Sequence, residues 1–189
     1  IIQVGGEDYV SAYSVITQLS MTAMAFYEGT GQAAQPIIAA NYGAKNKTRI
    51  SQSIRKGIRL EIILTVFCAL LYILASKGIC GLFSIREGEL LSVTNGAIRI
   101  YALAIPFTGL NTFIMYTFQS QERTTIATIL SLISSCAMML IALFALTAVF
   151  GVGGIWYTWV VAQVLSLIVS FCFYHFYGGK RMDGGIGTI

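Results

Sequence analysis

The sequence is poor in charged residues and lacks the residue patterns that build catalytic or metal sites. Only 11% of its 189 residues are charged, against roughly 25% in average soluble domains. It has one histidine and no H-E-x-x-H, Ser/His/Asp or paired-carboxylate motif. Its four cysteines are scattered and form no C-x-x-C pair, so neither a zinc site nor a disulfide framework is indicated. We therefore expect no enzyme, no bound metal and no cofactor.

Apolar residues are abundant instead. They make up 56% of the chain, and the mean hydropathy is +0.75. A soluble domain of this length could not bury so much apolar surface, so lipid must be the solvent for much of it. Membrane β-strands would need alternating segments of about ten residues, and the apolar runs do not alternate. The composition predicts an all-α integral membrane protein.

Five apolar runs are long enough to cross a bilayer, which takes about 20 residues for roughly 30 Å of hydrocarbon. They cover residues 10–40, 58–76, 91–118, 126–150 and 154–176. Shorter polar segments separate them: an acidic turn at residues 5–8, a basic loop at 41–57, a mixed segment at 77–89, and turns at 121–123 and 151–154. We expect a transmembrane part over residues 1–177 and a flexible Gly-rich tail over 178–189.

The positive charges predict the orientation of these spans. The net charge is +4, which could suggest nucleic acid, but five of the twelve bases gather in the loop at residues 41–57 between two apolar runs. Bases concentrate in the cytoplasmic loops of membrane proteins. We therefore expect a multi-pass protein of the cell membrane, with loop 41–57 and the C-terminus in the cytoplasm, and no nucleic-acid partner.

Glu28 is the residue that fits its surroundings least. A carboxylate inside a membrane span costs about 2.5–3.5 kcal/mol on insertion scales, and such groups usually line ion or substrate pathways. Glu28 lies in the first apolar run. It is a candidate for proton exchange or for binding a cationic ligand. The alternative is that it reaches the membrane interface or pairs with a polar neighbour.

Other polar residues inside the spans are candidates for the same cavity. Gln32 and Gln35 share the helical face of Glu28, and Pro36 removes a backbone hydrogen bond next to them. Asn111 and Gln119 lie within the third span. The alternative for these amides is hydrogen bonding across a seam between helices.

Two stretches resemble known motifs of one transporter family. The first is the segment Gln35-Pro36-Ile37-Ile38, Asn41-Tyr42-Gly43-Ala44-Lys45-Asn46 and Arg49, and the second is Pro106-Phe107-Thr108-Gly109-Leu110-Asn111 followed by Phe118-Gln119. Together with the GVGGIW turn at residues 151–156, they resemble the C-terminal lobe of the MATE family, the multidrug and toxic compound extrusion transporters. The resemblance covers most of the chain up to about residue 178.

The resemblance implies a fold and a function. The five spans would be the eighth to twelfth helices of a twelve-helix transporter, and residues 1–4 would end the first helix of this six-helix lobe. The partners would be the lipid bilayer, the missing N-terminal lobe of the same chain and a small organic cation. The family exports organic cations and drugs in exchange for H⁺ or Na⁺ by alternating access. The family turn is carried here by Gln35, Pro36, Asn41, Tyr42, Gly43, Ala44 and Arg49.

The sequence also departs from the family pattern. Sodium-coupled members have an acidic residue near the position of Thr108, which carries no charge, so the coupling ion stays open between H⁺ and Na⁺. Alternative functions are a lipid-linked sugar flippase of the same superfamily, an integral membrane enzyme, or a structural membrane subunit. Arginine-lined spans would favour the flippase, and Asp-rich or His motifs in the loops would favour the enzyme.

Overall fold

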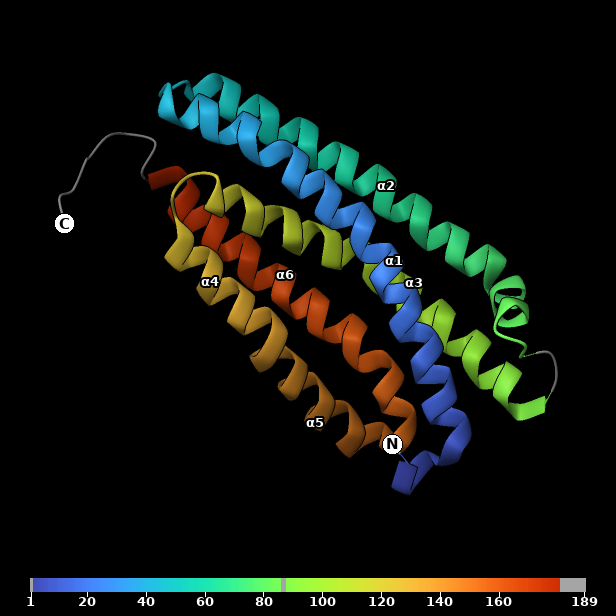
Figure 1. Ribbon diagram of the computed structural model, residues 1–189. Helices are drawn as coiled ribbons and strands as arrows, with labels where there is room; N and C mark the ends of the chain where they lie inside the picture. Colours follow the sequence, from blue (N-terminus) through green and yellow to red (C-terminus); the bar gives the residue numbers. More distant parts are fainter. Residues whose placement is uncertain (1, 86–87, 181–189) are drawn as a thin grey trace.

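The computed structural model describes residues 2–85 and 88–180, and the helices in these ranges form an antiparallel bundle (Figure 1). The elements are α1 (Ile2–Gly43), α2 (Lys47–Leu82), α3 (Gly88–Gln119), α4 (Thr124–Leu132), the π-turn η1 (Ile133–Ala137), α5 (Met138–Phe150), the 3₁₀ turn η2 (Gly151–Gly153) and α6 (Gly154–Lys180). The described residues contain no strand. The predicted all-α fold is confirmed.

Four membrane spans are evident from length and apolar composition. They are α2, α3, the continuous rod formed by α4, η1 and α5, and α6 up to His175. The outward faces of these helices carry large exposed apolar side chains, among them Ile63, Leu74, Phe144 and Phe171. Since apolar surface on this scale needs a lipid solvent, the chain is a multi-pass membrane protein. The first predicted span is also helical, as part of α1, but it is richer in polar residues than the other four.

The first two helices are much longer than a bilayer is thick. With a rise of about 1.5 Å per residue, the 42 residues of α1 extend about 63 Å and the 36 residues of α2 about 54 Å. The two run side by side and project beyond the others at the end where they join (Figure 1). Five of the chain's twelve bases lie on the first turns of α2 at this end: Lys47, Arg49, Arg55, Lys56 and Arg59.

Three predicted connections differ from the structure. The acidic turn at residues 5–8 is wrong, because α1 continues through it from Ile2; residues 2–4 belong to α1 and do not end a separate helix. Each helical glycine costs only about 1 kcal/mol relative to alanine, which a long helix can absorb. The loop at residues 41–57 shrinks to residues 44–46. The mixed segment at residues 77–89 is helical at both ends.

The end of the chain is also more helical than predicted. The expected tail begins at residue 178, but α6 continues to Lys180. Residues 181–189 lie outside the described residues. The turns predicted at residues 121–123 and 151–154 are confirmed.

Helix α3 is the centre of the bundle. It packs against α1 and α2 on one side and against α6 on the other, and α6 in turn packs against α5 (Figure 1). It carries more buried residues than any other described helix, including Phe113 and Phe118 at 1% exposure. Pro106 lies inside α3 and Pro36 inside α1, and neither ends its helix.

Candidate functional site

A polar cavity of about 210 Å³ lies between α1 and the α4–η1 rod, with α3 and α6 as its other walls. Its lining mixes a carboxyl group, aromatic rings, amides and hydroxyls: Tyr27, Glu28, Asn111, Ser134, Trp159 and Gln163. Polar groups are costly at membrane depth unless they line a cavity or pair with one another. In this bundle, polar side chains from α1, α3, α4, η1 and α6 line the same cavity.

The structure places two of the predicted site residues, Glu28 and Asn111, at this cavity. Glu28 comes from the middle of α1 and is half-buried. Asn111 comes from α3 and is 7% exposed. Residues 83 positions apart in the chain thus face the same space, which the sequence alone did not establish.

Asn111 also ties two helices together. Its side-chain Nδ2 donates to the backbone carbonyl of Gln163 at 3.0 Å and to the side-chain Oε1 of Gln163 at 2.9 Å. Its own Oδ1 is buried without a hydrogen-bond partner among the described residues. Cavity lining and hydrogen bonding across helices are alternatives for Asn111 in the sequence analysis, and in the structure this residue does both.

The other predicted amides do not line this cavity. Gln32 is exposed, and its Nε2 donates to the phenol oxygen of Tyr116 at 3.4 Å, which links α1 to α3. Gln35 and Gln119 are half-buried and absent from the cavity wall. For these residues, the structure gives no link to Glu28 beyond the shared helix or bundle.

A π-turn shapes one wall of the cavity. The rod opposite α1 is α-helical except at η1, where Ser134 and Ser135 face the cavity together with Ser131 of α4. Such π-turns insert an extra residue into a helix and are frequent at functional sites. Gln163 and these serines were missed from the sequence, although a polar residue inside an apolar run was the signal that singled out Asn111.

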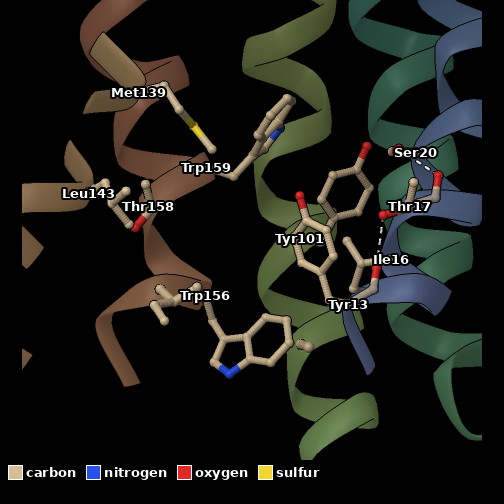
Figure 2. A pocket seen from close by; sticks show the side chains of 12 residues that line it. Tyr13, Ile16, Thr17, Ser20, Tyr101, Met139, Leu143, Trp156, Thr158 and Trp159 are labelled. Carbon is tan, nitrogen blue, oxygen red and sulfur yellow. Dashed lines mark hydrogen bonds between the residues drawn. The ribbon is translucent and has the colours of Figure 1, made fainter. Parts of the chain in front are cut away.

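A second cavity, of about 120 Å³, lies farther along the same space toward the α5–α6 connection, and its lining is mainly aromatic and aliphatic. Figure 2 shows Tyr13 and Tyr101 on one side and Trp156 and Trp159 near the other. The rings of Tyr101 and Trp159 are 6.5 Å apart and tilted by 43°. Trp159 lines both cavities, so this ring stands where they meet.

The family turn is built from short-range hydrogen bonds. The Asn41 side chain donates to the carbonyl of Ile37 at 2.7 Å, and the backbone N–H of Lys45 donates to the carbonyl of Tyr42 at 2.9 Å. Lys45 has a φ of 54°. Asn46 then caps α2, because its Oδ1 accepts from the backbone N–H of Arg49 at 3.0 Å. The side chain of Arg49 is exposed, so these residues fix a tight reversal far from the cavity.

The largest omission from the sequence analysis is Glu61. The sequence places it within the second apolar run, where it was not singled out. In the structure it lies within α2 and is 0% exposed, and neither of its carboxyl oxygens has a hydrogen-bond partner among the described residues. The signal was present, since Glu61 stands inside the apolar run at residues 58–76.

Glycine in α3 makes room for this carboxyl group. A Cβ on Gly109 would collide with Oε1 of Glu61 and would lie 2.6 Å from Cγ2 of Thr65. The neighbouring Thr108 lines the polar cavity, and its hydroxyl donates to the carbonyl of Ala104 at 3.0 Å. Thr108 carries no charge, as the sequence analysis noted. The carboxyl group of Glu61, from α2, instead lies against the adjacent residue, Gly109.

Comparison with known proteins identifies the family. The MatE family model matches residues 1–153. No protein with a curated description matches the chain by sequence. Solved structures match most of it in fold. They include an outward-facing multidrug resistance MATE transporter of the MOP superfamily, at a TM-score of 0.84 and 18% identity over 93% of this chain.

Two further solved structures that match the fold are a transporter in another conformation and a transporter for which a different function is suggested. An inward-facing multidrug resistance MATE transporter matches at a TM-score of 0.85 and 17% identity, also over 93% of this chain. A MOP superfamily transporter from Pyrococcus furiosus, described as having a binding pocket of reverse polarity that suggests a different function, matches at 0.86 and 17% identity over 97%. The chain spans 40% of the first of these structures and 41% of the other two. At these identities the likeness shows the fold, and the family model places the chain in the MatE family of membrane transporters.

Proposed function

We propose that this chain is one lobe of a secondary active antiporter that exports organic cations in exchange for H⁺ or Na⁺ by alternating access. The observation that carries the proposal is the polar cavity, which presents Glu28 beside the aromatic rings of Tyr27 and Trp159. A carboxylate attracts a cation by charge, and an aromatic face attracts it through its quadrupole. Asn111, Gln163 and the serines of the opposite wall add hydrogen-bonding groups that suit varied ligands.

The similarity of the lobe to relatives in two different states supports alternating access. Transporters of this kind move one repeat against another around a fixed site. The chain is about equally similar to an outward-facing and an inward-facing relative, with TM-scores of 0.84 and 0.85. A lobe that moves as one body would match both states alike. We therefore propose that the substrate binds between this lobe and the remainder of the transporter.

The charge of the cavity also bears on the rival function. A flippase for lipid-linked sugars handles a phosphate-bearing substrate, for which a wall of bases would be suitable. The polar cavity has a carboxyl group and no Lys or Arg among its lining residues. We propose cation export for this reason, and we treat the flippase as the outcome to exclude.

A transport assay with Glu28→Gln tests this proposal. The protein would be expressed from the complete open reading frame that encodes the chain, in cells without other drug exporters, and efflux of a fluorescent organic cation would be followed. We expect Glu28→Gln to reduce export at least about tenfold, which corresponds to ~1.4 kcal/mol. Glu89→Gln is the matched control, because Glu89 is an exposed carboxylate in the first turn of α3. Equal loss in both variants, or no loss in Glu28→Gln, would contradict the role of the cavity.

We also propose that the end of the bundle bearing the α1–α2 turn faces the cytoplasm. This end carries Lys45, Lys47 and Arg49, and the α3–α4 connection lies at the same end (Figure 1). In a cysteine-free background, a cysteine in place of the exposed Thr48 should resist a membrane-impermeant maleimide in intact cells and react after permeabilisation. Reaction in intact cells would reverse the orientation.

A further inference from the structure

We propose that Glu61 is a proton-binding site of this transporter, occupied by a proton in the conformation described here. The proposal rests on the antiport function above and deepens it, because it chooses H⁺ over Na⁺ as the ion handled by this lobe. It also separates two carboxyl groups by role. Glu28 faces the cavity, whereas Glu61 lies in the dry interface of α1, α2 and α3.

The burial of Glu61 is complete. The side chain is 0% exposed, in a helix long and apolar enough to span the membrane. An ionised carboxylate without compensation in such a place is so costly that the group takes up a proton instead. A buried charge persists only when it is paired or hydrogen-bonded, so the neighbours of Glu61 decide its state.

The hydroxyl groups nearest to this side chain are already engaged. Thr30 of α1 approaches the carboxyl group, but its hydroxyl donates to the carbonyl of Phe26 at 3.1 Å. The hydroxyl of Thr65 donates to the backbone carbonyl of Glu61 itself at 2.6 Å. Both carboxyl oxygens therefore remain without a donor among the described residues. A carboxylate would have nothing to stabilise it, whereas a protonated acid is neutral.

Among the described residues, no base lies within hydrogen-bonding distance of the carboxyl group. The titratable group of α1 that interacts electrostatically with Glu61 is Tyr27, which also interacts with Glu28 and with Cys68 of α2. From α3 the contact is Gly109, which has no side chain. The base closest in sequence is Arg59, which is exposed and, two residues away on the same helix, points in another direction. The choice of H⁺ follows from the neutral state that complete burial favours for the carboxyl group, and the transport test below separates H⁺ from Na⁺.

Tyr27 connects the buried acid to the cavity. Its side chain lines the polar cavity and lies within electrostatic range of both Glu28 and Glu61. When the Tyr27 side chain rotates away, water from the cavity can reach Glu61 while α1, α2 and α3 stay packed together. The carboxylic acid then transfers its proton to water and becomes a carboxylate, and the reverse transfer restores the acid. This gives two states of Glu61 that differ by one proton and depend on the position of the Tyr27 ring.

Infrared difference spectroscopy and transport together test the proposal. The complete protein would be compared with Glu61→Gln, an isosteric change that keeps a neutral side chain, and with Glu89→Gln as control. We expect the wild type and Glu89→Gln to show at neutral pH the carbonyl stretch of a protonated carboxyl group that shifts in D₂O, and Glu61→Gln to have lost it. Persistence of the full band in Glu61→Gln would overturn the proposal.

Transport in proteoliposomes gives the second readout. An imposed pH gradient should drive uphill accumulation of the cation by the wild type, and Glu61→Gln should lose this accumulation at least tenfold while it still exchanges substrate at equal concentrations. Uphill transport by Glu61→Gln, or accumulation driven by a Na⁺ gradient alone, would contradict the proposal. If the wild type transports no cation at all, the proposed function fails, and the infrared band still decides the protonation of Glu61.

Discussion

The two sides of α3 are built in opposite ways. Toward α1 and α2, the helices approach so closely that Gly57 and Gly109 leave no room for a Cβ atom, the first against the ring of Phe113 and the second against Glu61. Toward α6 and the α4–η1–α5 rod, the same helix borders two cavities. One face of α3 is thus tightly packed, and the other, hollow side borders one polar and one mainly apolar cavity.

This difference shows how one helix can serve two purposes. Gly109 and Asn111 are two residues apart and so point to different sides of α3. Gly109 admits the tight contact, whereas Asn111 bonds across to α6 beside the cavity. Small residues let membrane helices pack closely, and polar residues join them by hydrogen bonds. The tight side keeps α1, α2 and α3 together as one body, which leaves ligand binding to the hollow side.

The largest expected effect comes from adding a single methyl group on the tight side. In Gly57→Ala, the new Cβ would collide with the end of the Phe113 ring, whose Cε2 atom would be 2.6 Å away. Phe113 is 1% exposed and cannot move freely, and overpacking of this kind costs about 1–3 kcal/mol. We expect a lower thermal unfolding temperature in detergent. Gly78→Ala on the same helix is the control, because its Cβ would meet no atom within 4 Å. Equal stability of the two variants would show that the interface is looser than described.

A smaller effect is expected from the hydrogen bonds that join α3 to the hollow side. Asn111→Ala removes both bonds to Gln163 and leaves the Oε1 of Gln163 without this donor. We expect a loss of about 1 kcal/mol, within the range measured for hydrogen bonds between membrane helices. A double-mutant cycle with Gln163→Ala isolates the side-chain bond from the bond to the backbone. A coupling energy near zero would mean that the amides meet without stabilising each other.

The sequence predicted the elements better than their relations. Apolar runs located the helices because a bilayer demands about 20 apolar residues per span, and the turn at Asn41–Asn46 followed from short-range bonding. Sequence could not show that α1 continues through residues 5–8, since the helix penalty of glycine is modest and a long helix can absorb it. Nor could it show that Glu61 is buried, because burial depends on α1 and α3, which are distant in the chain. The candidate site was found in part through Glu28 and Asn111, and its other walls needed the fold.

A weaker effect on stability is expected at the α1–α2 turn, which belongs to neither side of α3. A variant there gives a reference against which the effects on the two sides can be compared. Asn46→Ala removes the side-chain acceptor that caps α2 at the N–H of Arg49. Loss of such a cap costs about 0.5–2 kcal/mol, and we expect the low end because Asn46 is exposed to solvent. Asn46→Asp keeps the acceptor and should retain stability in the same unfolding assay. If Asn46→Ala were as damaging as Gly57→Ala, the tight side would not be the principal source of stability.

The hollow side should tolerate a larger side chain in folding but not in function. Ser134 lies in the π-turn and lines the polar cavity, so Ser134→Leu extends into open space instead of into a neighbour. We expect its stability to change by less than about 0.5 kcal/mol, as for substitutions away from packed features, while binding of an organic cation weakens at least about tenfold. Cys136→Leu is the matched control, because Cys136 belongs to the same π-turn but is exposed and does not line the cavity. Equal binding by the two variants would mean that this cavity is not the substrate site. A large loss of stability in Ser134→Leu would mean that the hollow side is packed like the tight one. If α3 has a packed face and a binding face, Ser134→Leu should keep its stability and lose binding. Gly57→Ala should instead lose stability.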